Sequence, residues 1–289
     1  MKRIFIASLF LFFLSASGCR PAPSPFPASG NLTVHFIDVG QGDCILIDLG
    51  QTEVLIDGGE RNTGAADYIR PYIDGPLDAI VATHSHADHI GGLIDVLGAY
   101  KVTDVFVNGE NATTATFKSF ISAVAVDGAV VHQVEIGNII HVGNLTFTVF
   151  NPGHTLVPDD PNNNSIVLNL KYGSVDFLFT GDAENSTETK IMLQSEVQPP
   201  DVDILKVGHH GSRTASSEAF LEMINPEVAV YSAGVNNPYG HPHRQTIIAL
   251  NNAGAKVYGT DVHGTVVITT DGTGYTVKTE KQAPVITVN

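Results

Sequence analysis

The segment Thr83–His89 contains three imidazole side chains and one carboxylate: His84, His86, Asp88 and His89. It follows an apolar stretch and precedes a run with helical periodicity. In an extended segment the first two histidines point the same way, and the turn into a helix brings the aspartate and the third histidine back toward them. Imidazole and carboxylate groups suit Zn²⁺, with Mn²⁺ or Fe²⁺ as alternatives. The chain must therefore fold so that this strand end faces two adjacent metal ions.

Two ions need further ligands, and other predicted strands end in side chains of the right kinds. One apolar strand is followed by Asp182, whose carboxylate could bridge two cations, and another by His209 and His210. A third ends at Asp57, beside glycines that allow close backbone approach, although an aspartate before glycine is also a common turn residue. We expect these strand ends to meet.

From Leu32 onward the chain alternates short apolar runs with Gly, Pro and Asn, and no linker sequence divides this part into two domains. Many runs are apolar on both faces, which is typical of buried strands. Helical periodicity appears between them. The sequence predicts a single α/β domain, residues 31–289, with two sheets packed face to face and helices outside. The strands are expected at 32–37, 44–49, 53–56, 79–83, 104–107, 130–135, 145–150, 165–170, 175–180, 204–207, 228–231, 256–258 and 265–270. The helices are expected at 65–69, 89–97, 115–126, 186–193, 216–224 and 245–252.

Residues 1–18 read as an export signal, with Lys2 and Arg3 before the apolar run Ile4–Leu14 and small residues after it. The run is shorter than the roughly 20 residues that a membrane-spanning helix needs. Small residues ending at Cys19 resemble the bacterial lipobox, which makes Cys19 the expected lipidated first residue of a mature lipoprotein and the link to a membrane. The alternative is ordinary secretion, with the cysteine present by chance.

Residues 19–30 carry four alternating prolines and form a predicted spacer rather than a packed element. The whole chain has a formal net charge of −15, and signal cleavage would remove two basic residues and no acidic ones. Such a surface repels polyanions, so the general phosphate neutralisation used for non-specific nucleic-acid binding is not available. Any phosphate contact must be local or supplied by metal.

At these strand ends the sequence resembles the metallo-β-lactamase fold superfamily. Within it, the segments His35–Asp43, Asn162–Ser165, Val207–Ser212 and Tyr239–His243 resemble the C-terminal hydrolase domain of the ComEC competence proteins. The resemblance covers nearly all of residues 32–272 and implies a four-layer αββα sandwich. The transmembrane channel portion of those proteins has no counterpart here, so the sequence predicts a free-standing, exported relative.

The resemblance also implies a set of ligands. One metal ion would be held by His84 and His86, with His154 as the candidate third ligand. The second would be held by Asp88, His89 and His209, with Asp182 bridging both. Asp57 would orient a ligand, and His210 would support the site from behind. In the competence relatives the segment before the Asn-rich run is not a dependable histidine site, so the loop with Asn164 and Ser165 could face the metals in place of His154.

The remaining polar candidates have two interpretations each. His241 and His243 follow a Pro-Tyr-Gly turn and either line the cleft, as contacts for a phosphate or a leaving group, or cap a helix. His263 is evenly balanced between site and scaffold. Three residues of a Gly-rich turn could place backbone amides at the site or only close a hairpin: Asp38, Gln41 and Asp43.

The predicted chemistry is metal-assisted hydrolysis without a side-chain nucleophile. Asp88, Asp182 and His241 are the residues expected to take part in catalysis. The competence resemblance favours a phosphodiester substrate, that is, a nuclease or nucleotide phosphodiesterase at the outer cell surface; the sequence does not decide whether it takes part in DNA uptake. The net charge favours a small ester, lactone or nucleotide instead. A true β-lactamase fits less well, because many of those have a cysteine ligand in the second site, and a metal-loaded binding module without catalysis is the third possibility.

Overall fold

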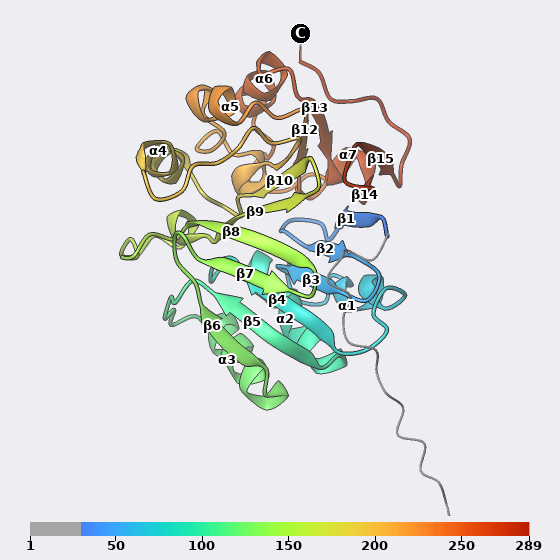
Figure 1. The fold of residues 1–289 in the computed structure, drawn as a ribbon, viewed down its shortest axis with the longest axis vertical. Helices are drawn as coiled ribbons and strands as arrows, with labels where there is room; N and C mark the ends of the chain where they lie inside the picture. The colour runs from blue at the N-terminus through green and yellow to red at the C-terminus, as the bar shows by residue number, and fades with distance from the viewer. Residues whose placement is uncertain (1–29, 289) are drawn as a thin grey trace, which may run out of the picture.

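The computed structural model describes residues 30–288, which form two β-sheets packed face to face (Figure 1). The predicted export signal 1–18, Cys19 and all but the last residue of the Pro-rich spacer lie outside the described residues. Within residues 30–288, no helix combines the length and the apolar character needed to cross a membrane.

The first sheet has eight strands in the order β15-β14-β1-β2-β3-β4-β5-β6, and the second has seven in the order β13-β12-β11-β10-β9-β8-β7. The first sheet contains β1 (Leu32–Phe36), β2 (Ile45–Asp48), β3 (Glu53–Ile56), β4 (Leu77–Ala82), β5 (Val102–Val107), β6 (Val130–Gln133), β14 (Val266–Thr270) and β15 (Tyr275–Thr279). The second contains β7 (Ile139–Val142), β8 (Leu145–Asn151), β9 (Val167–Tyr172), β10 (Val175–Phe179), β11 (Ile204–Lys206), β12 (Val228–Tyr231) and β13 (Lys256–Gly259).

Helices cover the outer face of each sheet. The helices are α1 (Ala65–Ile69), α2 (Ala87–Ala99), α3 (Ala115–Asp127), α4 (Asn185–Leu193), α5 (Glu218–Ile224), α6 (Arg244–Asn252) and α7 (Thr260–His263), with 3₁₀ turns η1 (Asn162–Asn164) and η2 (Gly208–Gly211). In Figure 1, α1–α3 lie against the first sheet and α4–α6 against the second. A central core of apolar side chains from both sheets fills the space between them. The predicted four-layer sandwich is confirmed.

Three elements were not predicted: β7, β15 and α7. The two strands lie at sheet edges, and each has a half-exposed face, so neither reads as a continuous apolar run.

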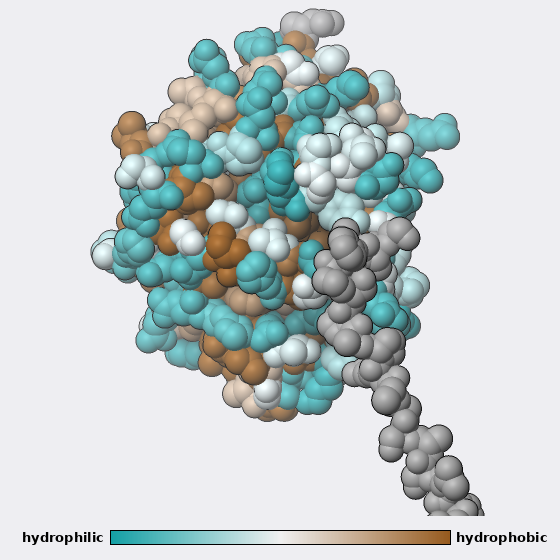
Figure 2. All heavy atoms as spheres, in the orientation of Figure 1, coloured by the Kyte–Doolittle hydropathy of each residue, from teal (hydrophilic) through white to brown (hydrophobic). Residues whose placement is uncertain are grey.

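The face of the molecule in Figure 2 mixes polar side chains with small apolar patches, as expected for helices with one buried side.

The start of α2 rests directly on the loop that follows β3. Gly92 N donates to Gly59 O at 2.9 Å, and Gly58 N donates to the carbonyl of His89 at 2.7 Å. A Cβ atom at Gly92 would lie only 1.9 Å from Gly58 O. This contact fixes the helix that follows the histidine segment against the loop that carries Asp57.

We predict that Gly92→Ala lowers the free energy of unfolding by about 2 kcal/mol or more, because the added methyl group overpacks this contact. Gly98→Ala is the matched control on the same helix. Gly98 is exposed with nothing near its Cβ position, so alanine there should raise stability by up to about 1 kcal/mol through helix propensity. Chemical denaturation of both variants measures the two effects, and equal stability would contradict the packing argument.

Candidate metal centre

The predicted site residues meet where parallel strands end. β3 and β4 are parallel neighbours in the first sheet, and β10 and β11 are parallel neighbours in the second. Asp57 follows β3, and the histidine segment follows β4. Asp182 follows β10, and η2 with its two histidines follows β11. Because the sheets face each other, these strand ends form one cluster.

The first group of possible ligands consists of His84, His86 and Asp182. His84 Nε2 lies 3.0 Å from His86 Nδ1 and 3.7 Å from Asp182 Oδ2. On its other side, His84 Nδ1 lies 3.3 Å from Ser165 Oγ, which also accepts the backbone N–H of Asp182. Burial, together with the neighbouring His89, lowers the pKa of His84 well below its usual value, so this imidazole keeps a free electron pair.

The second group of possible ligands consists of Asp43, His89, His210 and the same Asp182. His89 Nε2 lies 3.3 Å from both Asp182 Oδ2 and His210 Nε2. His210 Nε2 lies 3.4 Å from Asp182 Oδ2 and 3.3 Å from Asp88 Oδ2. Asp182 therefore stands between the two groups, in the position of a bridging ligand.

The chemistry of these donors fits metal ions. Asp57 Oδ2 accepts from His89 Nδ1 at 2.7 Å, and the carbonyl of Ser232 accepts from His210 Nδ1 at 3.0 Å. With each Nδ1 bound to its acceptor, the two Nε2 atoms face each other over 3.3 Å, an arrangement that a proton or a metal ion between them stabilises. Asp182 Oδ1 is buried and has no hydrogen-bond partner. A buried, unpartnered carboxylate oxygen is costly unless it binds a cation.

The charges of the cluster point the same way. Burial lowers the pKa of His89, but the carboxylates of Asp182 and Asp57 outweigh it and hold that pKa well above its usual value. Burial also lowers the pKa of His210, but the carboxylate of Asp182 outweighs it and holds that pKa well above its usual value. Burial raises the pKa of Asp182, and the two imidazoles reverse this and keep it well below the usual range. The carboxylates thus stabilise positive charge in the cluster. Protons on the imidazoles supply this charge until a metal ion replaces them.

The structure reverses the expected roles of His209 and His210. Both residues adopt left-handed backbone conformations, with φ of 47° and 54°, which turn the two neighbouring side chains in different directions. His209 Nδ1 lies 2.9 Å from Glu184 Oε1, its Nε2 is 3.9 Å from Asp182 Oδ2, and its side chain is 23% exposed. His210, not His209, is the buried histidine of the second group.

His154 does not reach the cluster. Its side chain is 58% exposed and lies between Glu135 and Glu196, with contacts of 3.1 and 3.3 Å. The loop after β8 carries it to the surface. Ser165, from the alternative loop, is the residue that approaches the first group instead.

His263 is also placed away from the cluster, buried in α7 beside β13. Its Nδ1 lies 3.2 Å from the carbonyl of Gly259 and its Nε2 lies 3.1 Å from that of Pro284. The ring therefore fastens the C-terminal segment to the second sheet. This placement corrects its candidate role at the site.

Three more candidates serve the surrounding loops and a helix end. Asp38 Oδ1 accepts from Gly40 N and closes the turn after β1. Asn164 bonds to Val157 in both directions through its amide and donates to Glu110, so it shapes the loop beside the site. His243 accepts from Arg213 N through Nδ1 and is the N-cap residue of α6, with its ring packed edge-on against His241.

An open hollow of about 350 Å³ gives access to the cluster. It is lined by Gln41, Glu60, His86, Ala87, Asp88, Asp182, His209, His210, Tyr239 and His241. Both Gln41 and His241 line this hollow, and Gln41 Nε2 and His241 Nδ1 are buried without hydrogen-bond partners. Burial and the neighbouring histidines lower the pKa of His241 to about 4, which keeps its ring neutral.

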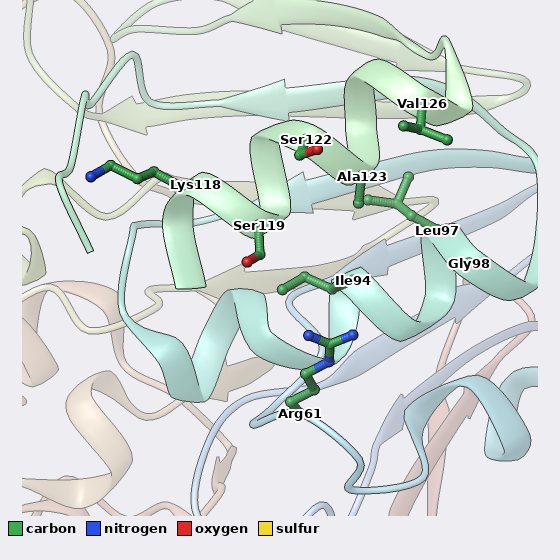
Figure 3. A pocket seen from close by; sticks show the side chains of 9 residues that line it. All are labelled: Arg61, Ile94, Leu97, Gly98, Lys118, Ser119, Ser122, Ala123 and Val126. Atoms are coloured by element: carbon green, nitrogen blue, oxygen red, sulfur yellow. The ribbon is translucent and has the colours of Figure 1, made fainter. Parts of the chain in front are cut away.

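A larger hollow of about 500 Å³ lies elsewhere, between α2 and α3 (Figure 3). Its wall combines apolar side chains such as Ile94 and Leu97 with serines, Arg61 and Lys118. No histidine, cysteine or carboxylate is found among the described residues that line it. The chemistry therefore belongs to the smaller hollow.

The sequence reasoning missed Lys206, a fully buried lysine whose Nζ lies 2.7 Å from Asp43 Oδ2. The signal was present, because a charged residue interrupts the apolar run Ile204–Val207 three residues before the first histidine of η2. The sequence left open whether Asp43 contributes to the site or only closes a hairpin. The structure places its other carboxylate oxygen 3.3 Å from His210 Nδ1.

Sequence comparison relates this chain to a known family and to individual proteins. The profile described as "Metallo-beta-lactamase superfamily" matches residues 37–235. The chain is 30% identical over 254 residues to "ComE operon protein 3" of Bacillus subtilis (strain 168), a match covering 81% of this chain and 32% of that protein. It is also 30% identical over 239 residues to "Recombination protein 2" of Haemophilus influenzae, covering 81% and 28%. The chain thus spans about a third of the length of these relatives.

Among solved structures, the metallo-beta-lactamase fold protein YhfI from Bacillus subtilis aligns with a TM-score of 0.58. The alignment covers 83% of this chain and 100% of the other, at 14% sequence identity. At this identity the likeness concerns the fold.

We predict that His210→Ala lowers the bound zinc from about two ions per chain toward one, because it removes the buried nitrogen that faces Asp182 and Asp88. His209→Ala and His154→Ala are the matched controls and should keep both ions. Elemental analysis of the purified variants measures the stoichiometry. Loss of an ion in His154→Ala, with both retained in His210→Ala, would reverse the assignment.

Proposed function

The chain belongs to the metallo-beta-lactamase superfamily and has the fold of a metal-dependent hydrolase, and we propose that its substrate is a phosphodiester. The observation that carries this proposal is the pair of ligand groups sharing Asp182 at the base of an open hollow. Paired cations are suited to phosphodiesters, because they neutralise the phosphate and hold both the attacking and the leaving oxygen.

When bound, two divalent cations would also lower the pKa of a water molecule and so supply the attacking group. The side chains around the hollow are arranged so that water, rather than a side chain, would be the attacking group. Among the described residues that line the hollow there is no serine, threonine or cysteine. Asp57 and Ser232 fix the rings of His89 and His210 from behind, so that each Nε2 faces the cluster.

His241 is placed to act on the substrate itself. Its ring lines the hollow, packs 5.4 Å from the ring of His209 and has a buried nitrogen without a partner. A neutral imidazole can accept a hydrogen bond through one nitrogen and donate through the other. We assign it the role of orienting the phosphate or the leaving group.

Two kinds of substrate are candidates: a long polynucleotide and a small molecule. The likeness to competence proteins and to a protein named for recombination supports a polynucleotide, and thus a nuclease. A specific observation favours a small ester, lactone or nucleotide instead. Among the residues described, no lysine or arginine lines the hollow, so neighbouring phosphates of a long chain would have no cationic partners there.

We predict that purified protein with bound metal hydrolyses bis-p-nitrophenyl phosphate, and that His86→Ala and Asp88→Ala each lower kcat by more than about 100-fold. His141→Ala, which changes an exposed histidine on β7, should leave the rate unchanged. Single-stranded DNA, lactones and a chromogenic cephalosporin tested in parallel distinguish the substrate classes. Full turnover by His86→Ala at matched metal content would exclude the two-metal mechanism.

For location, we propose export and anchoring of the mature chain through acyl groups on Cys19. The charged and apolar regions of residues 1–18 and the small residues before Cys19 support this. The proline-rich spacer would then hold the hydrolase domain away from the membrane.

Cys19→Ser is expected to move the processed protein from the membrane fraction to the soluble fraction, because it removes the only site for acyl chains in this scheme. Fractionation followed by immunoblotting measures the change. Membrane retention of the processed Cys19→Ser protein would contradict lipid anchoring.

A further inference from the structure

Lys206 is a charged residue in the interior, at the end of the central strand β11. Its side chain is 0% exposed, and its ammonium group has two acceptors: Asp43 Oδ2 at 2.7 Å and the carbonyl of Val207 at 2.9 Å. Removing a charge from water is expensive, so an isolated lysine rarely occupies such a place without a specific partner. Within the described residues, the ammonium group of Lys206 is therefore shielded from solvent.

The partner, Asp43, connects Lys206 to the metal centre. Asp43 belongs to the turn between β1 and β2 of the first sheet, whereas Lys206 belongs to the second sheet, so their ion pair joins the two sheets. The second carboxylate oxygen of Asp43 is buried without a hydrogen-bond partner and lies 3.3 Å from His210 Nδ1, close enough for a charge interaction with that ring. The carboxylate thus stands between the ammonium group and the imidazole.

The backbone of Asp43 reaches the other ligands. Its N–H donates to the carbonyl of Asp88 at 3.1 Å, and its own carbonyl accepts from Gly59 N at 2.7 Å. A Cβ atom at the preceding Gly42 would lie 2.2 Å from the carbonyl of Asp88, so the turn fits closely against the start of α2. Displacing Asp43 would therefore shift Asp88 as well as His210.

We propose that Lys206 is a positioning residue of the metal centre: its ammonium group fixes the Asp43 carboxylate against His210 and so holds His210 and Asp88 in place for the second metal ion. This inference rests on the proposed metal-dependent function. It assigns Lys206 no contact with substrate or metal. Partners of this kind, one step behind the ligands, typically change metal affinity by about 10- to 100-fold.

The test compares Lys206→Met, which keeps the length of the side chain and removes the charge, with the double variant Lys206→Met/Asp43→Asn. The double variant leaves no unpaired buried charge, so it separates folding from positioning. The matched control is Lys171→Met/Asp176→Asn, an ion pair of 2.6 Å in the same sheet whose lysine is 62% exposed. Zn²⁺ dissociation constants from chelator competition and melting temperatures in EDTA are measured for each.

A positioning role predicts that the weaker Zn²⁺ site loses at least about tenfold in affinity in Lys206→Met and remains weak in the double variant, although the melting temperature recovers. The control should keep wild-type affinity. Wild-type affinity in Lys206→Met, or recovery of affinity together with melting temperature in the double variant, would overturn the proposal. If Lys206→Met does not fold, the double variant decides alone. Wild-type hydrolysis is recorded separately, so failure of the proposed reaction is distinguishable from failure of this inference.

Discussion

The carboxylate of Asp182 is the group on which the site depends. Its Oδ2 atom lies within 3.9 Å of a nitrogen from each of four histidines, which follow strands of two different sheets, while its Oδ1 atom is buried without a partner. Such a concentration of donors is unfavourable unless positive charge fills it. The folded chain therefore favours bound cations at this site. Without them, bringing the histidine segment, η2 and the end of β10 together is unfavourable.

The loops around this cluster are fixed mainly by their backbones. Asp43 bonds to Asp88 and Gly59, and Gly58 bonds to His89, so the turns after β1, β3 and β4 share hydrogen bonds. Ligands built on the ends of strands and fastened in this way lose little freedom when a metal binds. Glycine is required at the closest approaches because a side chain would enter the neighbouring backbone.

Charge is divided between surface, hollow and interior. The chain is strongly acidic, and the described lining of the hollow holds no lysine or arginine, so an anionic substrate would depend on the metal ions for attraction. Lys206, the last residue of β11 before the site's η2 turn, faces inward and bonds to Asp43. In the role proposed above, this positive charge would order the ligands rather than attract substrate from solution.

The sequence by itself determined the sandwich and most of the cluster, because apolar runs mark strands wherever they occur and parallel strands bring their ends to one edge. Thr83–His89, Asp57 and Asp182 could be read in this way. The tertiary structure decided which of two adjacent histidines faces the cluster, since that depends on the left-handed backbone of His209 and His210. It also decided that His154 and His263 bond elsewhere, and that Lys206 meets Asp43 across the two sheets. Such pairings join residues far apart in the chain, and no local pattern of residue types records the path of a loop or the partner of a buried charge.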